Sequence, residues 1–207
     1  NVQDNRNEAR ETWLRAGGEW QASDAVVLRS QFWRYTADRT WLNNEISAFN
    51  AATGLVDRER FYVAQDQASW GNKTEAQWDA RLGSLDNRLV AAFEYSHTDL
   101  DRPGAANFPG DSVSLVDPAR GSYGRLTTQL QTTALRNTAL ALEDRLRVTP
   151  TVALIGGLRH ERIALDRSSA NAAGVQRAGF PYQKTWNPTT GRIGLTYKIT
   201  DQTSVYG

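Results

Sequence analysis

Apolar and polar residues alternate with a period of two along most of this chain, and no useful length shows the 3.6-residue period of an amphipathic helix. Between Thr74 and Leu82, small or apolar side chains occupy every second position, and charged or amide side chains occupy the positions between them. A strand places two such sets on opposite faces, whereas a helix would scatter the charges around its circumference. The pattern predicts an all-β fold of long antiparallel strands.

Short and long connections alternate along the predicted strands. Turn-rich clusters predict short turns at 21–24, 84–87, 148–151 and 199–202, and segments rich in Pro, Gly or Asn predict long irregular connections at 36–71, 100–124 and 167–183. Every second connection of an antiparallel sheet lies at the same end, so the long connections should share one end of the sheet. Outer-membrane β-barrels have this organisation, with short periplasmic turns and long external loops.

The two faces of the predicted sheet differ in polarity. We expect one set of residues to face lipid: Trp78, Ala80, Leu82, Leu89, Ala91, Phe93, Ile193 and Leu195. We expect a second set to face an aqueous lumen, because charges on so many strands need water: Glu75, Asp79, Arg81, Glu94, Arg159 and Arg192. Trp20, Trp78, Tyr95 and Tyr197 are placed for aromatic rims. Asp144 departs from the pattern, since it shares the parity of Leu140 and Leu142, and it fits only near the short-turn rim.

Composition narrows the class of protein. The formal net charge of +1 gives no electrostatic reason for binding nucleic acid, and the longest apolar stretches are far shorter than the ~20 residues of a spanning helix. The sequence contains no Met and no Cys. A chain that opens without an initiator and stops within a predicted strand indicates part of a longer protein. About eight strands are therefore expected to form part of a larger barrel wall.

Three segments carry a resemblance to one known family. The strand–turn–strand at 140–163 contains Gly157-Leu158-Arg159-His160-Glu161, which is similar to a "GLRYD"-like strand of that family, with His160 where an aromatic is usual. The segment 186–207 resembles a later hairpin through Pro188, Gly194, Leu195, Tyr197, Val205 and Tyr206. The segment 40–79 looks like a long external loop, including Asn43-Asn44, Gly54, Arg58 and Gly71-Asn72. In this order the three segments resemble TonB-dependent outer-membrane receptors of the ferric-siderophore branch.

The resemblance implies a barrel of about 22 strands in the bacterial outer membrane, closed by an N-terminal plug domain. It also implies uptake of a ferric siderophore with energy from the TonB complex. Residues 1–207 would be part of one barrel domain, and nothing in them resembles a plug or a TonB box. Plug domain, TonB complex, siderophore and outer-membrane lipid or lipopolysaccharide are the implied partners.

Iron would arrive already chelated, so we expect no directly bound cofactor, no metal ligands and no catalytic residues. Aromatic surfaces and cationic donors would instead hold a bulky complex. The ligand-binding candidates are Trp33, Tyr35, Trp41, Arg58, Arg60, Phe61, Tyr62, Trp70 and Tyr182. Packing within the loops is the alternative role for each of them. A further possibility is that Arg15, Arg29, Arg159 and Arg192 pair with carboxylates of the plug.

Two other function classes remain open at this level. One is a passive small outer-membrane barrel or porin-like channel, which the long aromatic loops oppose. The other is a soluble β-sandwich binding domain, in which the aromatic residues would form an ordinary core. Neither class requires an enzyme activity, and the two His residues show no spacing to a nucleophile or base that would suggest one.

Overall fold

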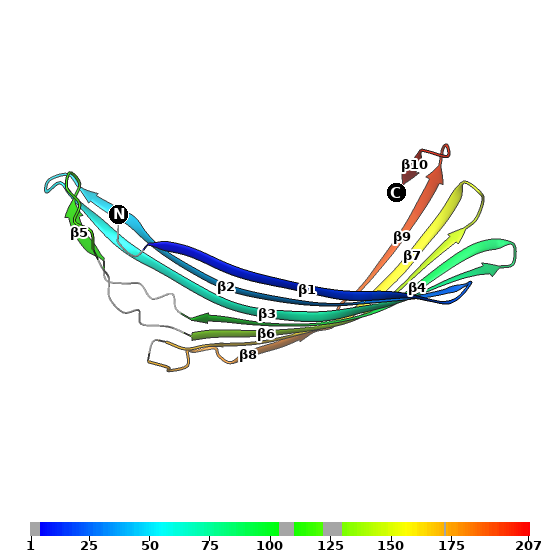
Figure 1. The fold of residues 1–207 in the computed structure, drawn as a ribbon, viewed down its shortest axis with the longest axis horizontal. Helices are drawn as coiled ribbons and strands as arrows, with labels where there is room; N and C mark the ends of the chain where they lie inside the picture. The colour runs from blue at the N-terminus through cyan, green and yellow to red at the C-terminus, as the bar shows by residue number, and fades with distance from the viewer. Residues whose placement is uncertain (1–4, 104–109, 122–129, 172) are drawn as a thin grey trace.

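The chain forms one continuous antiparallel sheet in a computed structural model that describes residues 5–103, 110–121, 130–171 and 173–207 (Figure 1). Eight strands follow one another in space in the order β1-β2-β3-β4-β6-β7-β9-β10. They are β1 (Arg6–Ser23), β2 (Val26–Asn50), β3 (Leu55–Leu82), β4 (Leu85–Pro103), β6 (Leu130–Arg147), β7 (Val152–Ser169), β9 (Thr189–Lys198) and β10 (Ser204–Tyr206). Two short strands lie off this path: β5 (Asp111–Ser114) pairs with β3, and β8 (Tyr182–Trp186) pairs with β7. The predicted fold class is confirmed.

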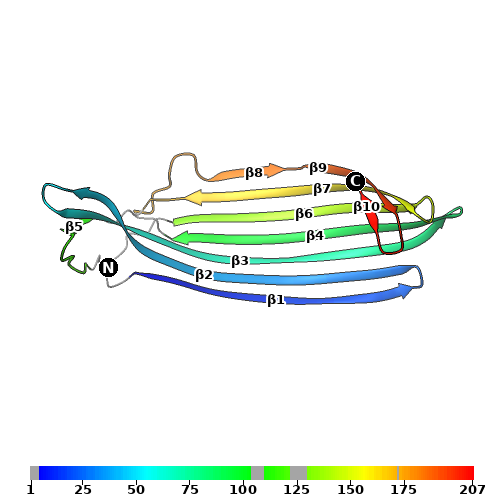
Figure 2. The same cartoon turned by 90° about the horizontal axis from the view of Figure 1, so that it is seen from above.

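The short turns lie together at one end of the sheet, as predicted (Figure 2). β1 leads into β2 through residues 24–25, β3 into β4 through 83–84, and β6 into β7 through 148–151. The left-handed φ of +66° at Gly83 explains why the second of these turns carries a glycine. The longer connections leave from the opposite end.

The prediction of an irregular connection over 36–71 is wrong. β2 and β3 pair without interruption from Val26 with Trp78 to Asn50 with Leu55, apart from one register shift near Ile46. Only residues 51–54 form the turn between them. The two other long connections are also shortened by strands, since β4 runs to Pro103 and β7 to Ser169. Residues 104–109 and 122–129 of the second connection lie outside the described part of the chain.

Strand register divides the side chains between two faces. Residues paired across an antiparallel ladder share a face, so the pairs Trp78 with Leu89 and Ala91 with Leu142 extend one apolar face from strand to strand. We call this the outer face. The pairs Lys73 with Glu94 and Asp79 with Arg88 belong to the opposite, inner face. Each of the fourteen residues assigned to a face from the sequence keeps its assigned side.

The outer face exposes large apolar side chains instead of covering them. Ile193 is 89% exposed and Leu158 is 64% exposed, and the described chain provides no second layer over them. A soluble β-sandwich would bury this face, so its exposed apolar side chains favour a barrel wall over the sandwich alternative. Trp70 and Trp78 are two outward aromatic residues of β3, and the strand spans nine residues from one to the other. Nine residues are enough for a tilted strand to cross a bilayer. We call the rows of paired residues from Trp70 to Trp78 the membrane-crossing rows. No helix in the described ranges is long and apolar enough to cross a membrane.

Candidate functional site

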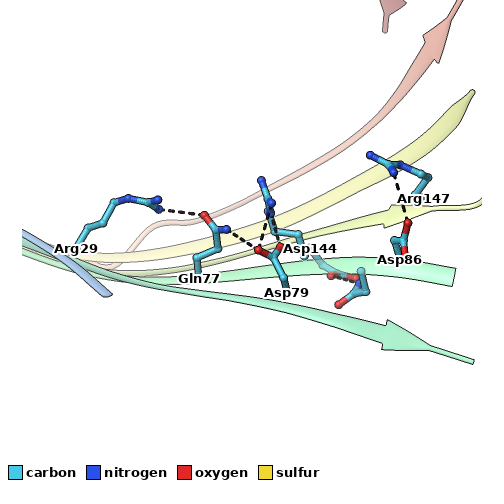
Figure 3. A network of polar contacts seen from close by, with 8 residues as sticks. Arg29, Gln77, Asp79, Asp86, Asp144 and Arg147 are labelled. Atoms are coloured by element: carbon cyan, nitrogen blue, oxygen red, sulfur yellow. Dashed lines mark hydrogen bonds and ion pairs between the residues drawn. The ribbon is translucent and has the colours of Figure 1, made fainter. Parts of the chain in front are cut away.

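The inner face carries a connected set of ion pairs at the short-turn end of the sheet. Nε of Arg29 donates to Glu19 at 2.6 Å, and its Nη1 donates to Oε1 of Gln77 at 3.0 Å. Gln77 in turn donates to Asp79 at 2.9 Å, and Asp79 accepts from Nε of Arg88 at 2.5 Å. Figure 3 shows Arg29, Gln77 and Asp79 on the concave side of the curved sheet. The contacts therefore join four strands, β1 to β4, across one polar wall.

Two inner-face arginines reach past their neighbouring strand. Nη2 of Arg159 on β7 donates to Glu94 on β4 at 2.6 Å, although β6 lies between these strands. Two β6 residues lie beneath this contact. Ala139 pairs with Glu94, and Ala141 pairs with Arg159. Since a larger side chain there would obstruct the arginine, the alanines make this contact possible.

Arg192 on β9 repeats this arrangement with a glycine. Its side chain forms an ion pair with Glu143 on β6 by crossing β7 at Gly157. A Cβ on Gly157 would lie 3.3 Å from Cγ of Arg192. Small residues on a middle strand thus allow long side chains to connect its two neighbours.

An aromatic cluster occupies the inner face at the other half of the sheet, on β1 and β2. We define it as Trp13, Trp33 and Tyr35. The rings of Trp13 and Tyr35 lie 4.4 Å apart between centroids, and Trp33 packs over Gly71, where a Cβ would meet its ring at 2.8 Å. Tyr35 is only 8% exposed, whereas Trp13 is 57% exposed and presents its surface to the lumen side.

Cationic groups flank the aromatic cluster. The guanidinium of Arg15 lies 5.4 Å from the centroid of the Trp13 ring. Nη2 of Arg39 donates to the hydroxyl of Tyr35 at 2.8 Å and to Glu11 at 2.5 Å. The bond to Glu11 and the nearby Tyr35 raise the pKa of Arg39, which lies beyond the membrane-crossing rows. Rigid rings beside fixed cations can hold a large ligand that combines apolar faces with anionic edges.

The whole chain, residues 1–207, matches the family model described as TonB dependent receptor-like, beta-barrel. The chain belongs to this receptor family. It therefore forms part of the outer-membrane β-barrel of a receptor. No curated protein matches it in sequence.

Solved receptors share the fold of this TonB-dependent receptor chain. The ferric-catecholate import receptor Fiu from E. coli K12 superposes with a TM-score of 0.82 at 15% identity, over 99% of this chain and 36% of that one. The siderophore receptor PiuA from Acinetobacter baumannii gives 0.76 at 18% identity, over 98% and 32%. BauA, the ferric preacinetobactin receptor of Acinetobacter baumannii, gives 0.74 at 20% identity, over 97% and 30%. The chain thus spans about a third of each receptor's length.

The TonB-dependent receptor fold separates the ligand-binding candidates. Trp33, Tyr35 and Trp41 occupy inner-face positions of β2, and Trp41 is 45% exposed. Trp70 points to the outer face, where its ring lies 5.2 Å from that of Tyr95, so it lies on the opposite side of the sheet from Trp33. Trp70 is an aromatic residue of the membrane rim.

The remaining candidates lie apart from the aromatic cluster. Arg58 is 4% exposed and its Nε donates to Asp111 of β5 at 2.7 Å, which removes it from the surface and assigns it to holding β5 against β3. Tyr62 has the parity of Trp70, opposite to Trp41. Tyr182 lies on β8, which is separated from the β2–β3 hairpin by β4, β6 and β7. The side chains of Arg60 and Phe61 lie outside the described part of the structure.

Trp13, Glu11 and Arg39 belong to the aromatic cluster and its flanks but are not among the sequence-derived candidates. Alternation along β1 places Trp13 on the opposite face from Leu14. Its contact with Tyr35 depends on the β1–β2 register, which the sequence does not show. Arg29, Arg159 and Arg192, considered for pairing with a plug, all have carboxylate partners within the wall.

Each histidine contacts a polar side chain on the outer face. Nε2 of His97 lies 2.8 Å from Asp99, and Nδ1 of His160 lies 2.8 Å from the hydroxyl of Thr189. The described residues contain no group of three His, Cys, Asp or Glu side chains that could hold a metal ion. Asp144, the outer-face exception, lies in the row of Trp78 near the short turns. It accepts a 2.5 Å hydrogen bond from Asn87.

Proposed function

We propose that this chain is part of the barrel wall of an outer-membrane receptor that takes up a ferric siderophore with energy from the TonB complex. The observation that carries the proposal is the aromatic cluster with Arg15 and Arg39 on the inner face. Trp33 and Arg15 lie in the row of Gly71, at the outer limit of the membrane-crossing rows, and the rows of Tyr35 and Arg39 lie beyond it. A chelate binds its iron itself, so the wall needs rings and cations rather than iron ligands. The receptors similar in fold are named for ferric-catecholate, ferric preacinetobactin or siderophore ligands, which supports the same class of cargo.

Partners of the whole receptor belong to the same proposal. A plug domain would fill the lumen, and the TonB complex would act through that domain. The inner-face ion pairs are largely satisfied within the wall, so a plug would meet a surface of paired charges. Such a surface favours a polar, hydrated contact, which suits a domain that must move during transport.

The binding role can be tested in the full-length receptor by replacing Trp13 with Ala. Trp20→Ala is a matched control, because Trp20 lies on the same strand at 64% exposure but on the outer face. We expect Trp13→Ala to weaken binding of at least one ferric probe, catecholate, hydroxamate or citrate, by about tenfold, as for an interface anchor. Trp20→Ala should leave the affinity unchanged. Equal affinity of both variants and wild type for every probe they bind would contradict the assignment.

A further inference from the structure

Four arginines and two aspartates line a hollow of about 560 Å³ at the short-turn end of the inner face. We call them the lower cluster: Arg81, Arg88, Arg145, Arg147, Asp79 and Asp86. The cluster begins one row beyond the membrane-crossing rows, because Asp79 follows Trp78 along β3. Ligand pockets commonly have volumes of roughly 300–1,000 Å³. The hollow therefore has the size of a binding site, and its lining carries more positive than negative charge.

Both aspartates of the lower cluster are already engaged. Asp79 accepts hydrogen bonds from Nε and Nη2 of Arg88 at 2.5 and 3.2 Å. The bond from Arg88 lowers the pKa of Asp79, so this carboxylate stays ionised. Asp86 binds Arg81 through Oδ1 and Arg147 through Oδ2, each at 3.4 Å, and Figure 3 shows the contact with Arg147 on the concave side of the sheet. Neither carboxylate is left for the fourth arginine.

Arg145 is the unpaired cation of the lower cluster. It is exposed, and no described residue forms an ion pair or side-chain hydrogen bond with it. In the β4–β6 register it lies directly opposite Arg88. Like charges in this position destabilise a sheet. An oxyanion between the two guanidinium groups would replace the repulsion by charge-assisted hydrogen bonds, which arginine forms readily with carboxylate-like groups.

Among the described residues of the inner face, the cations between the lower cluster and the aromatic cluster are all paired. In the rows of Lys73, Glu75 and Gln77, the ion pairs are Lys73 with Glu75, Arg29 with Glu19, Arg159 with Glu94 and Arg192 with Glu143. Arg15, beside the aromatic cluster, has no carboxylate partner in the described chain.

The two places with unpaired cations lie far apart along the wall. Gly71, in the row of Arg15, and Asp79 are eight residues apart on β3. At ~3.3 Å per residue, this separation is roughly 26 Å. An anion that leaves the aromatic cluster through the lumen would thus pass a neutralised wall before it reached Arg145.

We propose that the lower cluster is a second binding site for the cargo, which receives an anionic ferric chelate as the chelate leaves the lumen towards the periplasm. The inference rests on the proposed function. A cleft with an excess of one sign of charge raises the local concentration of an oppositely charged ligand and its rate of arrival. The site would therefore act on negatively charged chelates, such as catecholate or citrate complexes, and not on uncharged hydroxamate complexes.

The test measures energised iron uptake by cells that express the full-length receptor. The probes are anionic catecholate and citrate chelates of iron and an uncharged hydroxamate chelate. Arg145→Glu removes the excess of positive charge, and we expect it to slow saturated uptake of the anionic chelate by roughly tenfold, the lower end of the effect of such a field. Arg145→Lys keeps the charge and should keep the wild-type rate. Uptake of the uncharged chelate should not change.

Three controls separate this role from a structural one. Arg136→Gln removes an exposed charge from the outer face of the same strand and should leave uptake unchanged. The equilibrium affinity of the purified receptor for the anionic chelate should be the same in all variants, because the aromatic cluster lies at the other end of the wall. Heat stability of Arg145→Glu should equal or exceed that of wild type, since the repulsion with Arg88 is removed.

The possible failures are distinguishable. Wild-type uptake of the anionic chelate by Arg145→Glu would overturn the inference and leave the proposed function intact. Equal slowing of charged and uncharged chelates, or a loss of heat stability, would assign Arg145 to a contact with the plug and would also overturn it. A wild-type receptor that carries only the uncharged chelate would overturn the assignment to anions. A receptor that binds none of the probes would contradict the proposed function, and the inference with it.

Discussion

On the inner face, small residues leave room for the large side chains that pack over them. At Gly71 an added Cβ would lie 2.7 Å from the backbone oxygen of Tyr95 and 2.8 Å from the Trp33 ring. Gly18, also in a strand, has open space around the same position. We predict that Gly71→Ala destabilises the full-length receptor by about 1–3 kcal/mol, the usual cost of overpacking. Gly18→Ala should be neutral or slightly stabilising. Urea unfolding in lipid vesicles measures both, and equal free energies of unfolding would show that the Trp33 ring and the β4 backbone adjust to the added methyl group without cost.

At the scale of single residues, the sequence predicts which face of the sheet a side chain occupies but not which residue it contacts. Alternation assigns Arg159 and Glu94 to the lumen correctly, because parity along a strand is a local property. Their contact across β6 depends on the register of three strands and on Ala139 and Ala141 between them. Trp13 was missed as a candidate for the same reason, since only the β1–β2 register brings it to Tyr35.

The β2–β3 hairpin is the element that the sequence describes least well. Beyond the membrane both faces of a strand meet water, so alternation weakens although the backbone ladder continues. Asn43, Asn44 and Gly54 therefore suggested an irregular loop where strands persist to Asn50. The turns at the other end were predicted closely, because tight turns require residue types that are visible locally.

The hairpin's register allows a clean truncation. Trp41 pairs with Val63, so replacing residues 42–62 by Asn-Gly leaves a paired end and a favourable two-residue turn. If the extension contributes to the ligand site, ferric-ligand binding by the full-length receptor should weaken at least tenfold, or about 1.4 kcal/mol. Heat stability of the barrel should stay near normal, since the removed part lies outside the membrane. Unchanged affinity in a correctly inserted truncation would exclude the extension from the site.

Across the whole molecule, the two faces of the wall predict different costs for the same charge. Ala91 lies on the outer face between Ala76 and Leu142, whereas Ala92 lies on the inner face beside Glu75. We predict that Ala91→Arg costs about 2–4 kcal/mol of folding free energy in a bilayer. Ala92→Arg should cost much less, because water and Glu75 receive its charge. Folding titrations into vesicles compare the two variants, and similar costs would refute the membrane orientation.

The arginines that cross a strand have a consequence for how the wall responds to force. A strand held only by its ladder can peel away from its neighbour one residue pair at a time. Arg159 attaches β7 to β4, and Arg192 attaches β9 to β6, so each contact joins strands that share no backbone hydrogen bond. Tension on one strand is therefore carried to its second neighbour as well as to its first. We therefore expect the wall to yield in blocks of three strands rather than one strand at a time.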